Sequence, residues 1–330
     1  MQIKKCFFSF SILNSPLTTE PVEVSIKIVP LHPNLLPINK YMFRIVVLAK
    51  QVPDTRNVGK DAMKADGTVN RAALPAIFNP EDLNALELAL QMKSQIADSE
   101  VIILTMGPSR AAEIIRESMY RGADSGYLIT DRKFAGSDTL ATSYALSLAV
   151  KKLMPCDVVI AGRQAIDGDT AQVGPQTAEK LNMPQITYAE ELVDINRETV
   201  TIKRRLERGV EVVQAKLPVM ITVHSSAPDC RPRNAKLTMK YKHARTVSEL
   251  QDEDNDYIAL RHTRPYLDIK EWTVADLNAD DAWLGLTGSP TKVKKIDNVV
   301  FTQKDSKVLS NSDADVELLV VELLESRIIG

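Results

Sequence analysis

The feature that most constrains the fold is a regular alternation of strand and helix patterns between residues 42 and 182. Short runs rich in Val, Ile and Leu predict buried strands at 43–50, 100–107, 125–130 and 156–162. Helix patterns follow them, at 81–96, 109–122, 137–153 and 170–182. This order predicts a doubly wound, Rossmann-like parallel sheet with helices on both faces. The carboxyl ends of its strands meet at one edge, where such sheets bind ligands.

The first helix has a well-marked start in Asn79-Pro80-Glu81-Asp82. Asn is a good N-cap residue, Pro fits the first helical position, and two acids lie at the positive end of the helix dipole. The leucines that follow at spacings of three and four predict one buried face.

The loop from Gly162 to Thr170, GRQAIDGDT, is small and polar and lies where the fourth strand gives way to a helix. A helix that begins near Asp169 and Thr170 would offer free backbone N–H groups and a positive dipole end to an anion. Gly168 would let the backbone approach closely, and Asp167 and Asp169 would act as N-caps or as acceptors for ribose or adenine. The residues alone also allow a plain helix cap with an Asp-Gly turn.

The pattern changes after Pro184. Strands are expected at 185–192, 199–206 and 210–223, paired as antiparallel hairpins, with a turn at Arg208-Gly209 between the last two. We therefore predict a nucleotide-binding α/β domain over residues 42–225, with added antiparallel strands.

Residues 226–330 are irregular and predict an extended C-terminal arm that wraps a partner. Residues 247–268 resemble an inserted loop, and its acidic run at 251–256 is either solvated or specific for a partner. The apolar spacing of 314–329 predicts a helix that belongs to the core or to an interface.

Residues 1–41 read differently from the rest of the chain. Lys4-Lys5 and the apolar stretch 6–13 resemble a weak signal peptide, and the stretch up to Lys40 is rich in proline without clean periodicity. Because Met42 stands directly before the first strand, we expect 1–41 to be a disordered extension or a mis-assigned start.

Composition removes several classes of function. The net charge of −2 gives no field that would attract nucleic acid, and no apolar run is long enough to span a membrane. The three cysteines form no CxxC pair, which argues against a local zinc or iron–sulfur site and suits a reducing, cytoplasmic compartment. No GxGxxG, GxxxxGK[ST], HExxH or GxSxG motif occurs. We therefore expect no catalytic side chain and no metal ligand.

Several stretches in order resemble the electron transfer flavoprotein β subunit family, which includes the FixA proteins. They are IVVLAKQVPDT at 45–55, FNPEDLNALELAL at 78–90, LTMGP at 104–108, RGADSGYLITDRKFAGSDTLATSYALS at 121–147, the loop and helix from Gly162, and GLTGSPTKV at 285–293. The likeness runs from Met42 to about Ile296. It implies an adenine nucleotide alpha hydrolase-like sheet and a heterodimer with an α subunit that holds a redox-active FAD.

In this family the β subunit holds either a structural AMP or, in electron-bifurcating members, a second FAD that takes a hydride from NADH. The resemblance implies that the pocket here comprises Leu48, Asn79, Pro80, Glu81, Asp82, Met106, Gly162, Arg163, Gln164, Ala165, Ile166, Asp167, Gly168, Asp169, Thr170, Ala171, Gln172 and Val173. AMP-type members carry Asn-Gln-Thr in place of residues 171–173 and a third acid in place of Gly168. The chain thus resembles the branch that includes bifurcating members, and FAD is favoured over AMP.

The function implied is an electron carrier subunit between a flavin dehydrogenase and an acceptor, rather than a stand-alone enzyme; NADH oxidation follows only if the protein bifurcates. An adenine-nucleotide sensor or stress protein on the same sheet is the alternative. Arg163 either tunes the flavin or pairs with Asp167. Family members dock the dehydrogenase through a Tyr and an exposed Leu, and the counterpart segment 229–244 has Pro232 and Ala235 at those positions, which puts the usual docking in doubt.

Overall fold

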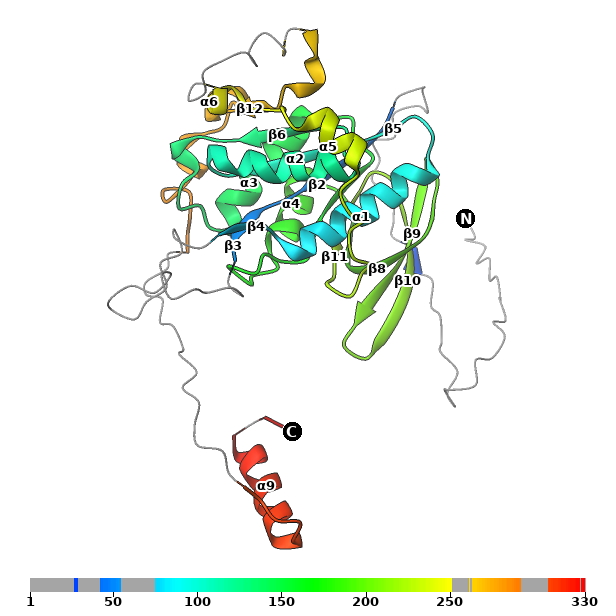
Figure 1. Cartoon of the computed structure of the whole chain (residues 1–330), viewed down its shortest axis with the longest axis vertical. Helices are drawn as coiled ribbons and strands as arrows, with labels where there is room; N and C mark the ends of the chain where they lie inside the picture. Colours follow the sequence, from blue (N-terminus) through cyan, green and yellow to red (C-terminus); the bar gives the residue numbers. More distant parts are fainter. Residues whose placement is uncertain are drawn as a thin grey trace, which may run out of the picture.

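The computed structural model describes residues 27–28, 42–54, 75–250, 261, 263–291, 308–326 and 328–329. The predicted α/β fold is confirmed: a single large, mostly parallel sheet runs through the body of the molecule (Figure 1). The sheet has ten strands in the order β1 (Lys27–Ile28), β10 (Gly209–Lys216), β9 (Thr199–Leu206), β8 (Gln185–Ile195), β11 (Val219–Val223), β7 (Val158–Gly162), β2 (Phe43–Leu48), β5 (Ser99–Met106), β6 (Ser125–Ile129) and β12 (Lys270–Trp272). A separate two-stranded ribbon pairs β3 (Gln51–Pro53) with β4 (Ala76–Phe78).

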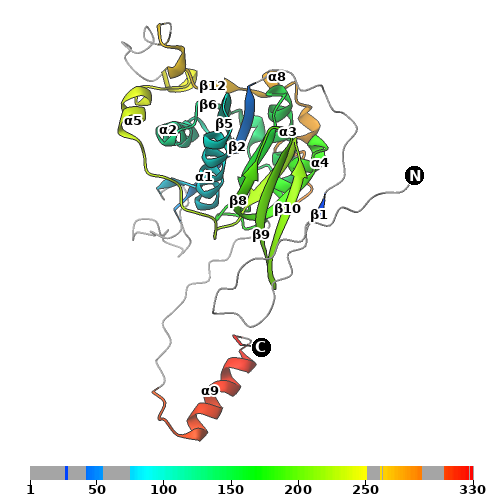
Figure 2. The same cartoon turned by 90° about the vertical axis from the view of Figure 1, so that its right-hand side faces the viewer.

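Helices cover both faces of the sheet, and Figure 2 shows α1 and α2 on one side of the strands and α3 and α4 on the other. One face packs against α1 (Pro80–Gln95) and α2 (Ala112–Arg121), and its core includes Leu86 and Ile115, both buried. The other face packs against α3 (Thr139–Lys152) and α4 (Val173–Leu181), with Ala145 and Ala178 fully buried. The four strand-helix repeats of the sequence thus form one doubly wound core.

The predicted pairing of the last strands is partly wrong. β8, β9 and β10 do form an antiparallel meander, and residues 207–208 link β9 to β10. The stretch 210–223, however, is two strands, interrupted at Leu217-Pro218, and β11 returns to lie parallel between β7 and β8. All five residues of β11 are buried, which is typical of a central parallel strand and leaves no polar face for a hairpin edge.

The segment after β11 packs on α2 through α5 and reaches α3 through α8, and it carries several short elements. They are α5 (Ala235–Tyr241), α6 (Val247–Leu250), η4 (Pro265–Leu267), α8 (Val274–Leu277) and η5 (Asp281–Trp283). Two further 3-10 helices, η2 (Ser109–Ala111) and η3 (Arg132–Phe134), lie in earlier loops. β12 adds a parallel edge strand beside β6. The acidic run 251–256 and most of residues 1–41 lie outside the described residues, so the expectations for them stay predictions.

The final helix, α9 (Asp313–Glu325), forms where the apolar spacing predicts it and lies apart from the sheet (Figures 1 and 2). None of its residues is buried, although five of its thirteen residues are leucine or valine with more than two fifths of their surface exposed. It is therefore not part of the core. Within the described ranges, no helix is both long and apolar enough to cross a membrane.

Candidate functional site

The winding of the sheet fixes where a ligand can enter. From β2 the chain moves outward through β5 and β6, then crosses back to β7 on the other side of β2. The strand order therefore reverses between β2 and β7, and the loops that leave these two strands diverge to opposite faces. Open α/β sheets bind ligands in the crevice at such a reversal, at the carboxyl ends of the strands. We call this place the crevice.

One buried carboxylate, Asp82, joins the walls of the crevice. It accepts the backbone N–H of Lys50 at 2.8 Å, just after β2, and the backbone N–H of Gly162 at 2.9 Å, at the end of β7. Burial raises the pKa of Asp82 to about 7, against the lowering effect of these hydrogen bonds and of the Asn79 side chain. A Cβ on Gly162 would lie 2.7 to 2.8 Å from the backbone of α1, so only glycine allows this approach.

Asn79 and Glu81 hold the loop after β7 in place. The Asn79 side chain donates to the Gln164 carbonyl at 2.9 Å and accepts from the Ile166 N–H at 3.2 Å. Glu81 accepts the Gln164 N–H at 2.9 Å. Asn79 stands at the N-cap position of α1 as predicted, but its side chain caps the loop instead of the helix. These predicted pocket residues therefore shape the backbone of the crevice.

Arg163 is bound to Glu81 and not to Asp167. Its Nη2 lies 2.9 Å from Glu81 Oε1, and its guanidinium lies over the ring of Tyr188, 5.8 Å from the ring centroid. The predicted alternative pairing with Asp167 is wrong. The Glu81 carboxylate also raises the pKa of Arg163, and the contact with Tyr188 places the guanidinium beside β8.

The helix after the loop begins later than predicted. α4 starts at Val173 with Gln172 as its N-cap, and neither Asp167 nor Asp169 caps it. The backbone takes left-handed φ values of 47° at Asp169 and 52° at Ala171, which turn the chain before the helix can form. As a result, the N–H groups of residues 170–172 have no hydrogen-bond partner among the described residues. Three consecutive free N–H groups before a helix suit an anion.

The other predicted residues divide by depth. Leu48 is buried beneath the crevice and belongs to the core, and Met106 is half-buried at the end of β5. Gly168 is exposed, and nothing lies within 4 Å of where its Cβ would be. Pro80 is the first residue of α1, and Ala165 lies in the turn of the loop. The loop therefore has open space at Gly168.

Sequence reasoning missed one residue of the crevice, Lys50. Its Nζ contacts both oxygens of Asp167, at 2.7 and 2.9 Å. Gln164 in turn donates to Asp169 at 2.9 Å. The signal was present, because a lysine directly after a buried strand reaches the ligand edge of a parallel sheet. The partner was not predictable, since 117 residues separate Lys50 from Asp167.

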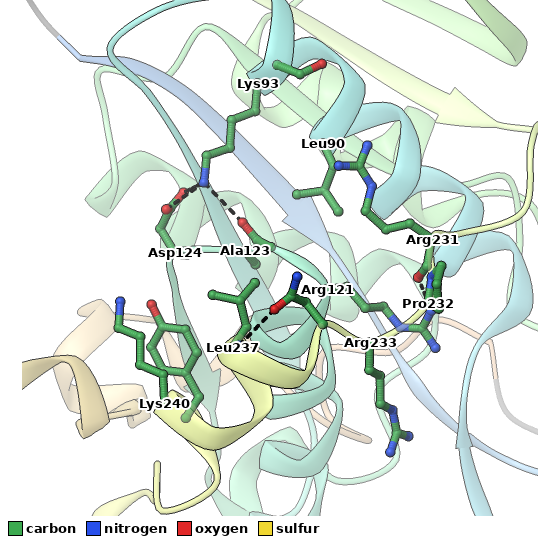
Figure 3. A pocket seen from close by; sticks show the side chains of 14 residues that line it. Leu90, Lys93, Arg121, Ala123, Asp124, Arg231, Pro232, Arg233, Leu237 and Lys240 are labelled. Carbon is green, nitrogen blue, oxygen red and sulfur yellow. Dashed lines mark hydrogen bonds and ion pairs between the residues drawn. The ribbon is translucent and has the colours of Figure 1, made fainter.

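A second hollow lies at the opposite, amino edge of the sheet (Figure 3). This groove of about 680 Å³ is lined by the ends of α1 and α2, the turn that leads into β6, α5 and the segment before α5. Its charged lining residues are Lys93, Arg121, Asp124, Arg231, Arg233 and Lys240.

Carboxylates compensate the groove's cations only in part. Lys93 pairs with Asp124 at 2.6 Å and Arg231 with Glu87 at 2.9 Å. Arg121 and Arg233 share Glu117, and Lys240 lies against the rings of Tyr241 and Tyr266. The groove therefore carries excess positive charge. Among the described residues, no three His, Cys, Asp or Glu side chains gather as a metal site.

Comparison with known proteins gives consistent matches. The profile of the electron transfer flavoprotein domain matches residues 66–254. The chain is 41% identical over 294 residues to the electron transfer flavoprotein subunit beta of Megasphaera elsdenii, covering 87% of this chain and 98% of the relative. It is 40% identical over 250 residues to the caffeyl-CoA reductase-Etf complex subunit CarD of Acetobacterium woodii, covering 76% and 86%. It is 36% identical over 276 residues to protein FixA of Azotobacter vinelandii, covering 82% and 89%.

Proposed function

The chain belongs to the electron transfer flavoprotein family as a β-type subunit, and from this premise we propose that the crevice between β2 and β7 binds an adenine nucleotide. Three observations support the proposal: the crevice lies at the sheet's reversal point, it offers free N–H groups at residues 170–172, and its walls are fixed by buried polar groups. The alternative function, an adenine-nucleotide sensor, receives no support from the family match.

The nucleotide we favour is FAD, with AMP as the competing ligand. The diphosphate of FAD needs room near the start of α4, and Gly168, Ala171 and Val173 provide small or apolar side chains there. When bound, the flavin supplies the redox chemistry, and the protein supplies binding, orientation and electrostatics. The Arg163–Glu81 pair places a fixed cation next to the loop and is our choice for tuning the bound group.

A second FAD is proposed to sit mainly in an α subunit, which completes the heterodimer. The exposed apolar surface of α9 and the exposed Trp283 and Leu286 support a partner on the C-terminal arm, because large apolar surfaces left in water mark interaction sites. A flavin dehydrogenase or reductase is the proposed electron partner, since relatives carry names such as caffeyl-CoA reductase-Etf complex subunit CarD. If FAD fills the crevice, NADH is the proposed hydride donor.

The surface proposed for that dehydrogenase is the groove beside α5. Ala235 is the first residue of α5 and Pro232 lies in the segment before it, so neither offers the large apolar anchor of the family. Excess positive charge and the exposed Met239 take the place of that anchor. Docking here is therefore expected to depend on charge.

The deciding experiment counts nucleotides in the heterodimer co-expressed with its α subunit. Acid-released FAD and AMP are quantified per heterodimer by chromatography. Two FAD support the proposal, whereas one FAD with stoichiometric AMP would show that the crevice takes AMP. The Gly168→Asp variant tests the choice between the two ligands. The open space at Gly168 accepts the carboxylate without a clash. Because the charge of the carboxylate repels a diphosphate, the AMP fraction should rise. An unchanged ratio would contradict the role of Gly168.

A further inference from the structure

The ion pair between Lys50 and Asp167 closes over the crevice and has an unusual placement. Lys50 follows β2 and Asp167 lies in the loop after β7, while Leu48 and Ala161 are paired neighbours in the two strands. The pair therefore bridges the mouth of the crevice. The Lys50 side chain is 48% exposed and that of Asp167 is 20% exposed, so water reaches the contact.

The backbone and the side chain of Lys50 are held very differently. Its N–H is bound to the buried Asp82, which fixes where the side chain starts. Its ammonium group is held by Asp167 alone in the contacts described. Exposed ion pairs contribute little to stability, so this contact can open at low cost. The backbone of Lys50 is thus fixed, whereas its ammonium group lies at the end of a flexible side chain.

The charges around the loop show why such a cation is needed. Asp167 and Asp169 both lie within the loop that leads to the free N–H groups of residues 170–172. A phosphate placed there meets two carboxylates. Arg163 does not compensate them in the contacts described, because its guanidinium pairs with Glu81 and lies over Tyr188.

We propose that Lys50 is the cation that contacts the phosphate of the bound nucleotide, and that Asp167 is its counter-ion in the empty crevice. This inference rests on the proposed function. On binding, the Lys50 ammonium moves from the carboxylate of Asp167 to a phosphate oxygen. In the empty protein, Asp167 then opposes nucleotide binding because it holds the Lys50 ammonium group. This role differs from the predicted one, in which Asp167 accepts a hydrogen bond from ribose or adenine.

Two substitutions give opposite results under this proposal. Lys50→Met removes a charge-assisted hydrogen bond to phosphate and should weaken AMP by about tenfold or more, leaving adenosine within about twofold of wild type. Asp167→Asn releases Lys50 and removes a negative charge, so AMP should bind several-fold more tightly. Lys50→Arg keeps the cation and should stay near wild type. Lys151→Met, at an exposed lysine near the end of α3, is the matched control.

The measurement is a calorimetric titration of the full heterodimer with AMP and with adenosine, after exchange of its resident nucleotide. Weaker AMP binding by Asp167→Asn would overturn the proposal, because it would make Asp167 a ligand contact. Equal losses of AMP and adenosine in Lys50→Met would overturn it as well, because they indicate a purely structural role. If wild type binds neither AMP nor FAD, the proposed function fails; if wild type binds AMP and Lys50→Met matches it, only the role of Lys50 fails.

Discussion

The two edges of the central sheet use charge in opposite ways. At the carboxyl edge, Glu81 and Asp82 are buried and bound to backbone N–H groups and to Arg163. At the amino edge, Arg231, Arg233 and Lys240 are exposed around the groove. Buried charges must be compensated by hydrogen bonds, whereas exposed ones remain hydrated. The crevice therefore uses its charges to fix a backbone, whereas the charges of the groove stay exposed to water.

The largest effect should come from filling the closest approach in the crevice. Gly162→Ala places a Cβ within 2.5 Å of Asp82 Oδ1 and against the backbone of α1, which cannot move aside easily. We expect a loss of about 3 kcal/mol in the free energy of unfolding, measured with urea, together with loss of bound nucleotide. Gly168→Ala is the matched control, because its Cβ meets nothing within 4 Å. A Gly162→Ala protein as stable as that control would contradict the packing described.

The next effect is a pH dependence carried by Asp82. Its pKa is raised from 3.8 to about 7 in the folded protein, so the native state binds a proton that the unfolded state releases. The contribution of Asp82 to stability is complete below about pH 4 and is lost as the pH rises through 7. Asp82→Asn should remove a slope of at most about 1.4 kcal/mol per pH unit in this window.

Urea unfolding of wild type and Asp82→Asn from pH 4.5 to 8 measures this difference. The two proteins should diverge along the pH axis up to about pH 7 and run parallel above it. Parallel curves over the whole window would mean that Asp82 stays ionised in the crevice.

The smallest effect on the protein itself should come from the groove. Arg233→Glu with Lys240→Glu reverses two exposed charges and should leave nucleotide content unchanged. Electron delivery between the heterodimer and its dehydrogenase should slow several-fold at low salt, and the difference should shrink as salt screens the surface charges. Lys151→Glu, an equal kind of change away from the groove, is the control. A salt-independent loss, or none, would remove the groove from the docking surface.

The sequence predicted the parts of the fold that depend on local pattern. β2, β5, β6 and β7 and helices α1 and α3 lie within two residues of their predicted ranges, whereas α2 begins three residues later than predicted, after η2. It did not predict that β11 rejoins the parallel core, because a short apolar run reads the same in a hairpin and in a central strand. It also misplaced the start of α4, since the left-handed turns at Asp169 and Ala171 leave little trace in residue type.

Local sequence pattern is enough to predict the alternation that makes a doubly wound sheet and the polar loop at the carboxyl ends of its strands. Both follow from the periodicity of apolar residues, which is a local property of each segment of the sequence. The partners of the charged side chains depend on the folded chain: Asp82 binds Lys50 and Gly162, Asp167 binds Lys50, and Arg163 binds Glu81. These pairs join residues 32 to 117 positions apart, and their choice depends on which strands become neighbours in the folded sheet.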